Sequence, residues 1–397
     1  MKSKRMFLDG NGAAAEALRL ARVQVIAAYP ITPQSPIAEG LAKDCATGRL
    51  NAKYMRVESE HSAMSACIGA SLTGVRVGTA TASVGLALMH EMLGSAAGLR
   101  CPIVMPVVNR SLVAPWSLWC DHTDAMAERD TGWLQLYAED AQAVLDLTLM
   151  AFRIGEQKEV LLPVMICMDG FYVSHTGGAV EVPDQADIDA FIPPYTPDNL
   201  ILDPDMPMFV NPLTMSDEYT ELKYQQKVGS DKSAPVVAEI MAEFGRTFGR
   251  KYEPVEFYQC DDAEDVIVSL GSMSGTAAYV VDKLRAQGQK VGSVKIVSFR
   301  PFPFRELRDK LAGKKRIAVL ERAHSLGGAT GPLTAEIRSS LVNLPVRIDG
   351  FVAGLGGRDI PPDTIEKVFQ LLRTAPSDSP TWVDVKPNAM QLREVEL

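Results

Sequence analysis

Three side chains with different chemistry each follow a mainly apolar stretch that reads as a β-strand. They are Thr32 after residues 23–29, Glu60 after residues 53–57 and Arg110 after residues 102–108. A carboxylate can exchange a proton, a hydroxyl can orient a polar substrate, and a guanidinium binds an anion through paired donors. Because ligands bind beyond the carboxyl ends of parallel strands, we expect the three side chains to converge in one site.

Each of these residues also has a purely structural explanation, which stays open when the residue is taken singly. Glu60 stands in the first turn of a predicted helix, where a carboxylate interacts favourably with the helix dipole. Arg110 could pair with Asp121 or Asp124, and Thr32 could belong to a turn. Three such residues at one edge of one sheet favour a site.

The segment around Thr32 restricts the backbone. In "YPITPQSP" the threonine lies between Pro30 and Pro33, and each proline ring fixes its own φ and limits the residue before it. The hydroxyl is therefore predicted to be held rigidly at the end of a strand.

Two glycine-containing motifs offer other chemistry. "GNGAAA" at 10–15 fits the dinucleotide fingerprint, but only a short apolar run precedes it and no acidic residue follows about 20 positions later. A helix start with Asn11 near the cap fits it better. "GSMSG" at 271–275 could bind an anion on backbone N–H groups or form a tight strand-to-helix turn.

The cysteines and histidines indicate no metal centre on this chain. The six cysteines include no C-x-x-C pair, and the five histidines show no metal-ligand spacing. Without a secretory signal, scattered cysteines indicate reduced thiols and a cytoplasmic location.

Length and charge limit the possible partners. The 397 residues suffice for two or three domains, and the net charge of −9 argues against nucleic acid or an anionic membrane as partner. Charged residues interrupt the most apolar region, residues 62–108, so we expect no membrane span.

The elements that position these residues alternate between helix and strand, which predicts an α/β fold with a parallel sheet covered on both faces. Four apolar residues at helical spacing mark a later helix: Val236, Ile240, Phe244 and Phe248. The predicted division is a first domain at 1–230 that ends in a Pro-rich extended connector, a linking helix at 231–258, a smaller α/β domain at 259–375 and a C-terminal arm at 376–397.

The same residues lie in segments that resemble a known family. "AAYPITPQSPIAE", "VESEHSAMSACIGAS", "PIVMPVVNRSLVAP" and "LGGRDI" are similar to the alpha subunit of 2-oxoacid:ferredoxin oxidoreductases of the pyruvate type. The similarity extends over nearly the whole chain. It implies a thiamine-diphosphate pyrimidine-binding domain followed by a transketolase-C-terminal-like domain.

The resemblance implies a role for each candidate residue. Glu60 matches the glutamate that hydrogen-bonds N1′ of the thiamine aminopyrimidine, and Tyr29, Pro30 and Ile31 are expected to contact the same cofactor. Arg110 matches the arginine that faces the substrate carboxylate, and Thr32 matches the threonine at the substrate. The implied reaction is oxidative decarboxylation of a 2-oxo acid with coenzyme A, giving acyl-CoA and CO₂.

Half of the cofactor site is expected on other chains. The G-D-G motif that holds the diphosphate and Mg²⁺ in thiamine enzymes is absent, since only "MDGF" and "IDGF" occur. The resemblance therefore implies a diphosphate-binding beta subunit, a gamma-type subunit and a ferredoxin-like subunit with [4Fe-4S] clusters. Ferredoxin or NAD would take the electrons.

Departures from the family pattern concern the substrate. Trp116 replaces a usual aliphatic residue and Cys120 a usual asparagine, near the expected pocket. Trp116 would offer an aromatic surface to an acid such as phenylglyoxylate, or it could be a packing change outside the pocket. The alternative substrate is pyruvate. One weaker alternative is a non-redox thiamine enzyme subunit, which would not copurify with iron–sulfur proteins. Another is a catalytically silent scaffold, and the intact Thr32, Glu60 and Arg110 argue against that one.

Overall fold

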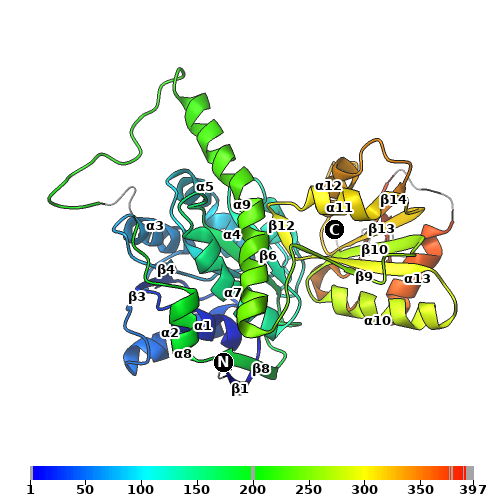
Figure 1. The fold of residues 1–397 in the computed structure, drawn as a ribbon, viewed down its shortest axis with the longest axis horizontal. Helices are drawn as coiled ribbons and strands as arrows, with labels where there is room; N and C mark the ends of the chain where they lie inside the picture. Colours follow the sequence, from blue (N-terminus) through cyan, green and yellow to red (C-terminus); the bar gives the residue numbers. More distant parts are fainter. Residues whose placement is uncertain (1–2, 198–201, 375, 377–378, 388, 390–397) are drawn as a thin grey trace. The chain divides into compact units, whose positions relative to one another are not determined.

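The computed structural model describes residues 3–197, 202–374, 376, 379–387 and 389. The chain forms two compact units (Figure 1). The first contains Met1–Glu256 and Ile296–Pro303, and the second contains Phe257–Lys295 and Phe304–Leu397. Both are built on sheets with parallel strands flanked in sequence by helices, which confirms the predicted α/β class.

A seven-stranded sheet forms the centre of the first unit, in the order β12-β6-β7-β5-β4-β2-β3. The strands are β2 (Val25–Ala28), β3 (Lys53–Arg56), β4 (Val77–Gly78), β5 (Val104–Asn109), β6 (Leu134–Ala138), β7 (Val164–Asp169) and β12 (Ser298–Arg300). All neighbours pair in parallel except β12, which runs antiparallel to β6. Since β5, β6 and β7 are buried throughout, the continuous apolar pattern of this region reflects a sheet covered on both faces.

The helices of the first unit follow from the same patterns. They are α1 (Gly10–Leu20), α2 (Ser35–Ala46), α3 (Glu60–Ser71), α4 (Ser83–Leu88), α5 (His90–Gly98), α6 (Thr123–Ala127), α7 (Ala141–Gly155), α8 (Gln185–Phe191) and α9 (Tyr219–Phe248). Helix α7 is apolar nearly all round and almost completely buried, as expected of a helix enclosed by the core. A two-stranded antiparallel ribbon, β1 (Ser3–Leu8) with β8 (Gly178–Pro183), completes this unit.

The second unit has a six-stranded sheet in the order β15-β14-β13-β10-β11-β9. Its strands are β9 (Val255–Tyr258), β10 (Asp265–Leu270), β11 (Val291–Ile296), β13 (Arg316–Glu321), β14 (Arg347–Val352) and β15 (Thr381–Trp382). Its helices are α10 (Met273–Ala286), α11 (Phe304–Leu311), α12 (Pro332–Ser340) and α13 (Pro362–Leu372), with a short 3₁₀ turn, η1 (Leu355–Gly357). The described part of the expected C-terminal arm supplies β15, which pairs in parallel with β14.

Three local expectations differ from the structure. The Pro-rich connector is not extended throughout, because it contains α8, whose Ile188 and Phe191 are buried in the core and which the prolines flank rather than interrupt. The apolar run at 293–301, which reads as one strand of the predicted helix–strand alternation, is split, since β11 joins the second unit's sheet and β12 pairs with β6 of the first. Helix α9 starts well before the 231 expected for the linking helix.

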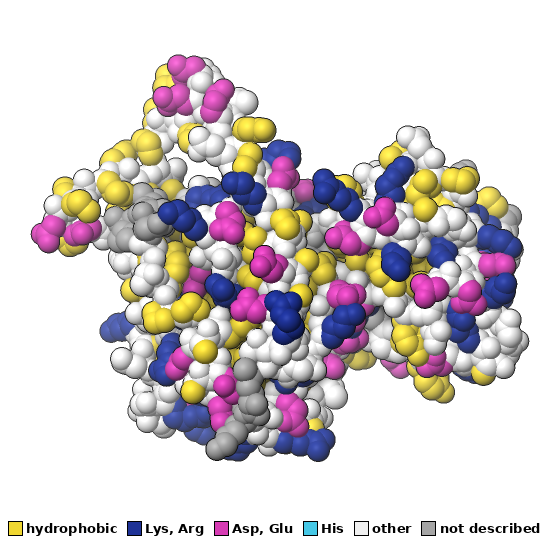
Figure 2. Space-filling view, in the orientation of Figure 1, with side chains coloured by type: hydrophobic (Ala, Val, Ile, Leu, Met, Phe, Trp, Pro, Cys, Tyr) yellow, Lys and Arg dark blue, Asp and Glu magenta, His cyan; other side chains and the backbone are white. Residues whose placement is uncertain are grey.

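The segment 202–225 contains no buried residue. It nevertheless carries nine large hydrophobic side chains exposed to solvent: Leu202, Met206, Met208, Phe209, Leu213, Met215, Tyr219, Leu222 and Tyr224. Figure 2 shows hydrophobic side chains over this segment and the beginning of α9. Within the part of the chain that the structure describes, no helix combines the length and apolar character needed to cross a bilayer.

The second half of α9 is predicted to stabilise the first unit through Phe244. Its ring is fully buried and lies 4.6 Å from Phe248 and 5.5 Å from Phe191, measured between ring centroids. Phe244→Ala should lower the free energy of unfolding by about 3–5 kcal/mol, because it removes a large buried side chain and leaves a cavity. Urea unfolding of the purified chain would show this as a lower midpoint with an unchanged slope.

Tyr224→Ala in the exposed half of the same helix is the control. It should change the free energy of unfolding by less than about 0.5 kcal/mol, as is usual for surface positions. Equal shifts for the two variants would contradict the packing role of Phe244.

Candidate active site

The three predicted residues follow parallel strands of the first unit's sheet. Thr32 follows β2, Glu60 is the first residue of α3 after β3, and Arg110 directly follows β5. Helix α3 begins here because the Ser59 hydroxyl accepts a hydrogen bond from the N–H of Ser62 at 3.2 Å. The carboxyl ends of parallel strands thus position all three residues at one edge of one sheet.

Arg110 connects the three residues. Its side chain is buried, and Nη1 donates a hydrogen bond to the carbonyl oxygen of Thr32 at 2.7 Å. Burial lowers the pKa of Arg110, while the negative charges of Asp124 and Glu60 act to raise it. Its Nε is buried without a hydrogen-bond partner among the described residues, so a donor remains for a ligand.

Glu60 lies against a glycine. The residue is only 6% exposed, and a Cβ added at Gly85 would lie 2.5 Å from the Glu60 Oε1 and 2.7 Å from the Thr81 Oγ1. Only glycine at position 85 therefore leaves the carboxylate in place. Among the described residues none forms a hydrogen bond with this carboxylate. Burial, a free carboxylate and the glycine cradle fit a planar heterocycle that presents a ring nitrogen.

The predicted cofactor contacts 29–31 and the substrate residue Thr32 lie on the surface of this unit. Tyr29, Pro30 and Thr32 are exposed and Ile31 is half-buried. Helix α1 holds the turn that follows Thr32, because Asn11 of α1 donates a hydrogen bond to the carbonyl oxygen of Pro33 at 3.0 Å.

That contact gives the "GNGAAA" motif a structural role. Asp9 caps α1 by accepting a hydrogen bond from Gly12 N at 2.7 Å, so the motif is a helix start with Asn11 near the cap, as expected. The strand before the motif, β1, belongs to the antiparallel ribbon and not to a βαβ unit. This arrangement does not match a dinucleotide fingerprint.

Asp124 in α6 is a further residue of the site, for which the sequence alone indicates only a possible ion pair with the Arg110 side chain. Its carboxylate instead accepts hydrogen bonds from Ser83 N, Arg110 N, Ala125 N and the Asn109 side-chain amide. Burial raises the pKa of Asp124 to about 6, although the four donors act to lower it. Asp121, the other candidate partner, accepts a hydrogen bond from the Ser111 hydroxyl at 2.6 Å.

The predicted substrate contact Trp116 is 77% exposed on the loop that follows Arg110. None of the described aromatic rings lies against it. The neighbouring Trp119 is also exposed, at 54%, but its ring packs on Phe171 with 4.6 Å between ring centroids.

Cys120 belongs to a buried cluster with His122 and Asp169. One ligand-type atom of each lies within 4.8 Å of the others. The His122 Nε2 and Asp169 Oδ1 are 2.6 Å apart, which is a hydrogen bond, whereas two ligands of a tetrahedral zinc ion would be about 3.3 Å apart. Asp169, the aspartate of "MDGF", is therefore hydrogen-bonded to His122.

The other cysteines show no activated thiol. Burial raises the pKa of Cys101 and Cys260 to about 11 and that of Cys67 to about 12. These three side chains are therefore neutral thiols at physiological pH.

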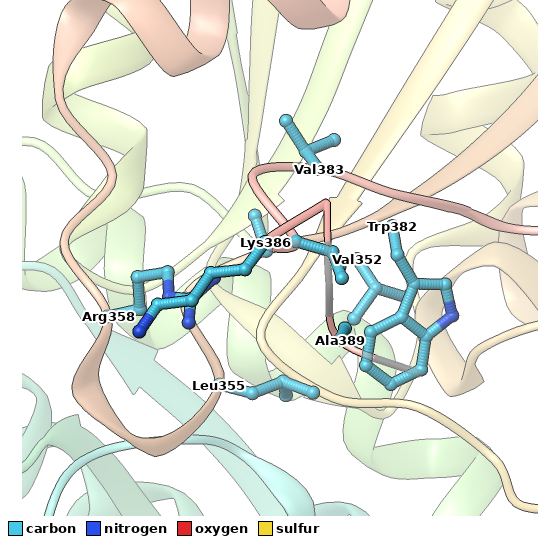
Figure 3. A pocket seen from close by; sticks show the side chains of 10 residues that line it. Val352, Leu355, Arg358, Trp382, Val383, Lys386 and Ala389 are labelled. Atoms are coloured by element: carbon cyan, nitrogen blue, oxygen red, sulfur yellow. The ribbon is translucent and has the colours of Figure 1, made fainter. Parts of the chain in front are cut away.

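Two cavities of the described chain are lined by residues other than Thr32, Glu60 and Arg110. A cavity of about 260 Å³ in the second unit lies beside Trp382, Arg358 and Lys386 (Figure 3). A cleft of about 500 Å³ in the first unit is lined by four arginines, each of which forms an ion pair with a carboxylate: Arg19, Arg22, Arg49 and Arg76. In "GSMSG" the first two residues form the turn between β10 and α10, with Gly271 at a φ of 62°, and the other three begin α10.

Comparison with known proteins identifies the two parts of the chain. Residues 16–242 match the family described as "Pyruvate flavodoxin/ferredoxin oxidoreductase, thiamine diP-bdg". Residues 263–365 match "Pyruvate:ferredoxin oxidoreductase core domain II".

Curated relatives match over nearly their whole length. The pyruvate synthase subunit PorA of Methanothermobacter thermautotrophicus is 47% identical over 381 residues, which cover 96% of this chain and 98% of the relative. That of Thermotoga maritima is 48% identical, covering 92% and 94%. The ketoisovalerate oxidoreductase subunit VorA of Pyrococcus abyssi is 45% identical and covers 93% of each chain.

Solved structures support the fold. A 2-oxoglutarate:ferredoxin oxidoreductase from Magnetococcus marinus superposes with a TM-score of 0.74 at 20% identity, covering 94% of this chain and 65% of that one. A split-gene transketolase superposes with a TM-score of 0.54 at 15% identity, covering 92% and 99%. With the family match over the first unit and these relatives, the chain belongs to the 2-oxoacid:ferredoxin oxidoreductase family as an alpha subunit with a thiamine-diphosphate-binding domain.

Proposed function

We propose that this chain provides the pyrimidine-binding half of the active site in a complex that oxidatively decarboxylates pyruvate. With coenzyme A the products are acetyl-CoA, CO₂, one proton and two electrons, and the electrons would pass to iron–sulfur centres on partner subunits. The observation that carries the proposal is the position of Arg110, which hydrogen-bonds the Thr32 carbonyl and interacts with the charge of Glu60. It joins an anion-binding group to a proton-exchanging group at one sheet edge.

Glu60 would exchange a proton with N1′ of the aminopyrimidine. The carboxylate has no hydrogen bond from the described residues, so it is available to a ring nitrogen. Its burial strengthens such a charge-assisted hydrogen bond, because the local dielectric is low. Thiamine diphosphate, when bound, supplies the electron sink for decarboxylation.

Arg110 would bind the carboxylate of the 2-oxo acid. The Thr32 carbonyl fixes one terminal nitrogen at 2.7 Å, and the unpartnered Nε remains as a donor. A guanidinium anchored at one nitrogen presents the others in a fixed plane, which suits the planar carboxylate. Thr32 lies beside this anion site and would orient the substrate through its hydroxyl.

Partner chains would supply the diphosphate and metal site and the clusters. Asp169 of "MDGF" is hydrogen-bonded to His122, and Asp349 of "IDGF" lies 2.5 Å from the Arg347 guanidinium. Neither carboxylate is arranged to bind Mg²⁺ beside a diphosphate. The exposed hydrophobic segment 202–225 also supports a chain that works within a complex, because isolated monomers seldom expose so much apolar surface.

The relatives favour pyruvate over an aromatic substrate. Several are named as pyruvate synthase subunits, and one as a ketoisovalerate oxidoreductase subunit. Trp116, on which the aromatic alternative depends, is exposed and has no ring contact among the described residues. Pyruvate is therefore the substrate that we propose.

The substrate assignment can be tested in the assembled complex with an artificial electron acceptor. Pyruvate should give the highest kcat/KM, above 2-oxoisovalerate and phenylglyoxylate. Trp116→Ile should change kcat/KM for pyruvate by less than about threefold, the usual limit for an exposed side chain. Best turnover of phenylglyoxylate, reduced by Trp116→Ile, would restore the aromatic alternative.

Glu60→Gln should reduce turnover by at least about 10²-fold, because glutamine keeps the shape but cannot exchange a proton. The measurement is kcat at saturating pyruvate and thiamine diphosphate. Glu58→Gln, two residues away and exposed, is the matched control and should retain normal turnover. Near-normal kcat in Glu60→Gln with cofactor bound would show that the assigned role is wrong.

Arg110→Lys keeps the charge and loses the planar pair of donors. It should reduce kcat/KM for pyruvate roughly 10- to 100-fold, the scale of one hydrogen bond to a charged group. Affinity for thiamine diphosphate should stay within about threefold of wild type. Arg56→Lys, at the exposed end of β3, is the control. Loss of cofactor affinity with an unchanged pyruvate response would make Arg110 a cofactor residue.

A further inference from the structure

We propose that Asp124 is a positioning residue. It holds Arg110, the proposed substrate-binding arginine, and Gly85, which lies against the Glu60 carboxylate, in one fixed arrangement. The inference rests on the proposed function, since it assumes that Arg110 binds the 2-oxo acid and that Glu60 serves the cofactor. Asp124 itself is buried and acts on these residues mainly through backbone N–H groups.

The two carboxylate oxygens of Asp124 divide their contacts between segments. Oδ2 accepts hydrogen bonds from the N–H of Ser83 at 2.9 Å and from the N–H of Arg110 at 3.0 Å. Oδ1 accepts from the side-chain amide of Asn109 at 2.8 Å and from the N–H of Ala125 at 2.7 Å. One oxygen thus joins the start of α4 to the residue after β5, and the other joins the end of β5 to α6.

The start of α4 is the segment that faces Glu60. Ser83 has a φ of 49°, in the left-handed region that serine rarely adopts, so external contacts must hold it. Those contacts are Asp124 and a second hydrogen bond, from the Ser83 hydroxyl to the Ser111 carbonyl at 2.5 Å. Two residues further along lies Gly85, against the Glu60 carboxylate. A shift of Ser83 would therefore move Gly85, which lies against Glu60, together with the backbone beside Arg110.

The arrangement requires a carboxylate. Four N–H donors converge on two oxygens, and each oxygen accepts two of them. An asparagine of the same shape would offer one oxygen and an NH₂ group, and the NH₂ would face two donors. At least two buried N–H groups would then lose their acceptor, which is costly in the interior. The negative charge also acts on the Arg110 guanidinium.

Another buried aspartate of this unit, Asp146, offers a control for effects on stability alone. Asp146 in α7 is also fully enclosed, and it accepts hydrogen bonds from Arg250 Nε at 2.6 Å and from the Tyr252 hydroxyl at 2.9 Å. Its hydrogen bonds in the described part of the chain go to Gln142, Arg250 and Tyr252, and none goes to Thr32, Glu60 or Arg110. Asp146→Asn should therefore destabilise the protein without changing the response to substrate.

The experiment measures KM and kcat for pyruvate in the assembled complex, together with the urea midpoint of each variant. Asp124→Asn should raise the KM for pyruvate at least about tenfold at a saturating cofactor concentration. Asp146→Asn should lower the midpoint and leave KM within about twofold. Adding Asp124→Asn to Arg110→Lys should cost much less in kcat/KM than in the wild-type background, because both changes disable the same group.

Three outcomes would decide against the inference or its premise. An unchanged KM in Asp124→Asn, with only a lower midpoint, would reduce Asp124 to a structural residue. If the fold-loss in kcat/KM of the double variant equalled the product of the two single fold-losses, Asp124 would not act through Arg110. If Arg110→Lys alone left the pyruvate response unchanged, the proposed function would fail first.

A milder variant covers the case in which Asp124→Asn does not assemble. Asn109→Ala removes one of the four donors and leaves the carboxylate in place. It should raise the KM for pyruvate in the same direction, by about threefold, with near-normal assembly. An unchanged KM in Asn109→Ala would then overturn the inference.

Discussion

The buried carboxylate of Asp124 is the interaction on which the geometry of the candidate site depends. Its four hydrogen bonds connect the start of α4, the end of β5 and helix α6. Enclosing a charge is unfavourable unless every lone pair finds a donor, so partial loss of this network would cost more than the missing bond alone. Loss of the Asp124 carboxylate would therefore be expected to disturb all of the segments that it connects.

The residues of the site that sequence could predict are those that directly follow strands. Thr32, Glu60 and Arg110 were recognisable because apolar runs mark the strands, and parallel strands bring their carboxyl ends to one edge. Asp124 lacks such a signal. It lies 14 residues after Arg110, beyond an exposed loop, in the short helix α6. Only the backbone path of that loop brings its carboxylate below the arginine.

The features of the fold that sequence could predict are likewise those that depend on residues close together in the chain. Periodicity predicted the α/β class, the strands before the site and the buried face of α9, because each depends on neighbours in sequence. The strand β12 pairs with β6, more than 150 residues earlier in the chain, and nothing in its own composition specifies that partner. Helix α8 was missed because prolines dominate its surroundings, although they stand at its flanks, where they do not break a helix.

The charges of the site explain why this chain needs more than its own residues. Glu60 and Asp124 are negative and Arg110 is positive, so the three together carry one net negative charge. A 2-oxo acid would add a second negative charge in a buried region, where repulsion is poorly screened. Arg110 alone cannot offset both carboxylates and the substrate. When bound, the cationic thiazolium ring of the cofactor would offset one of these negative charges, whereas the metal ion would be neutralised largely by the diphosphate, so further donors would have to come from partner subunits.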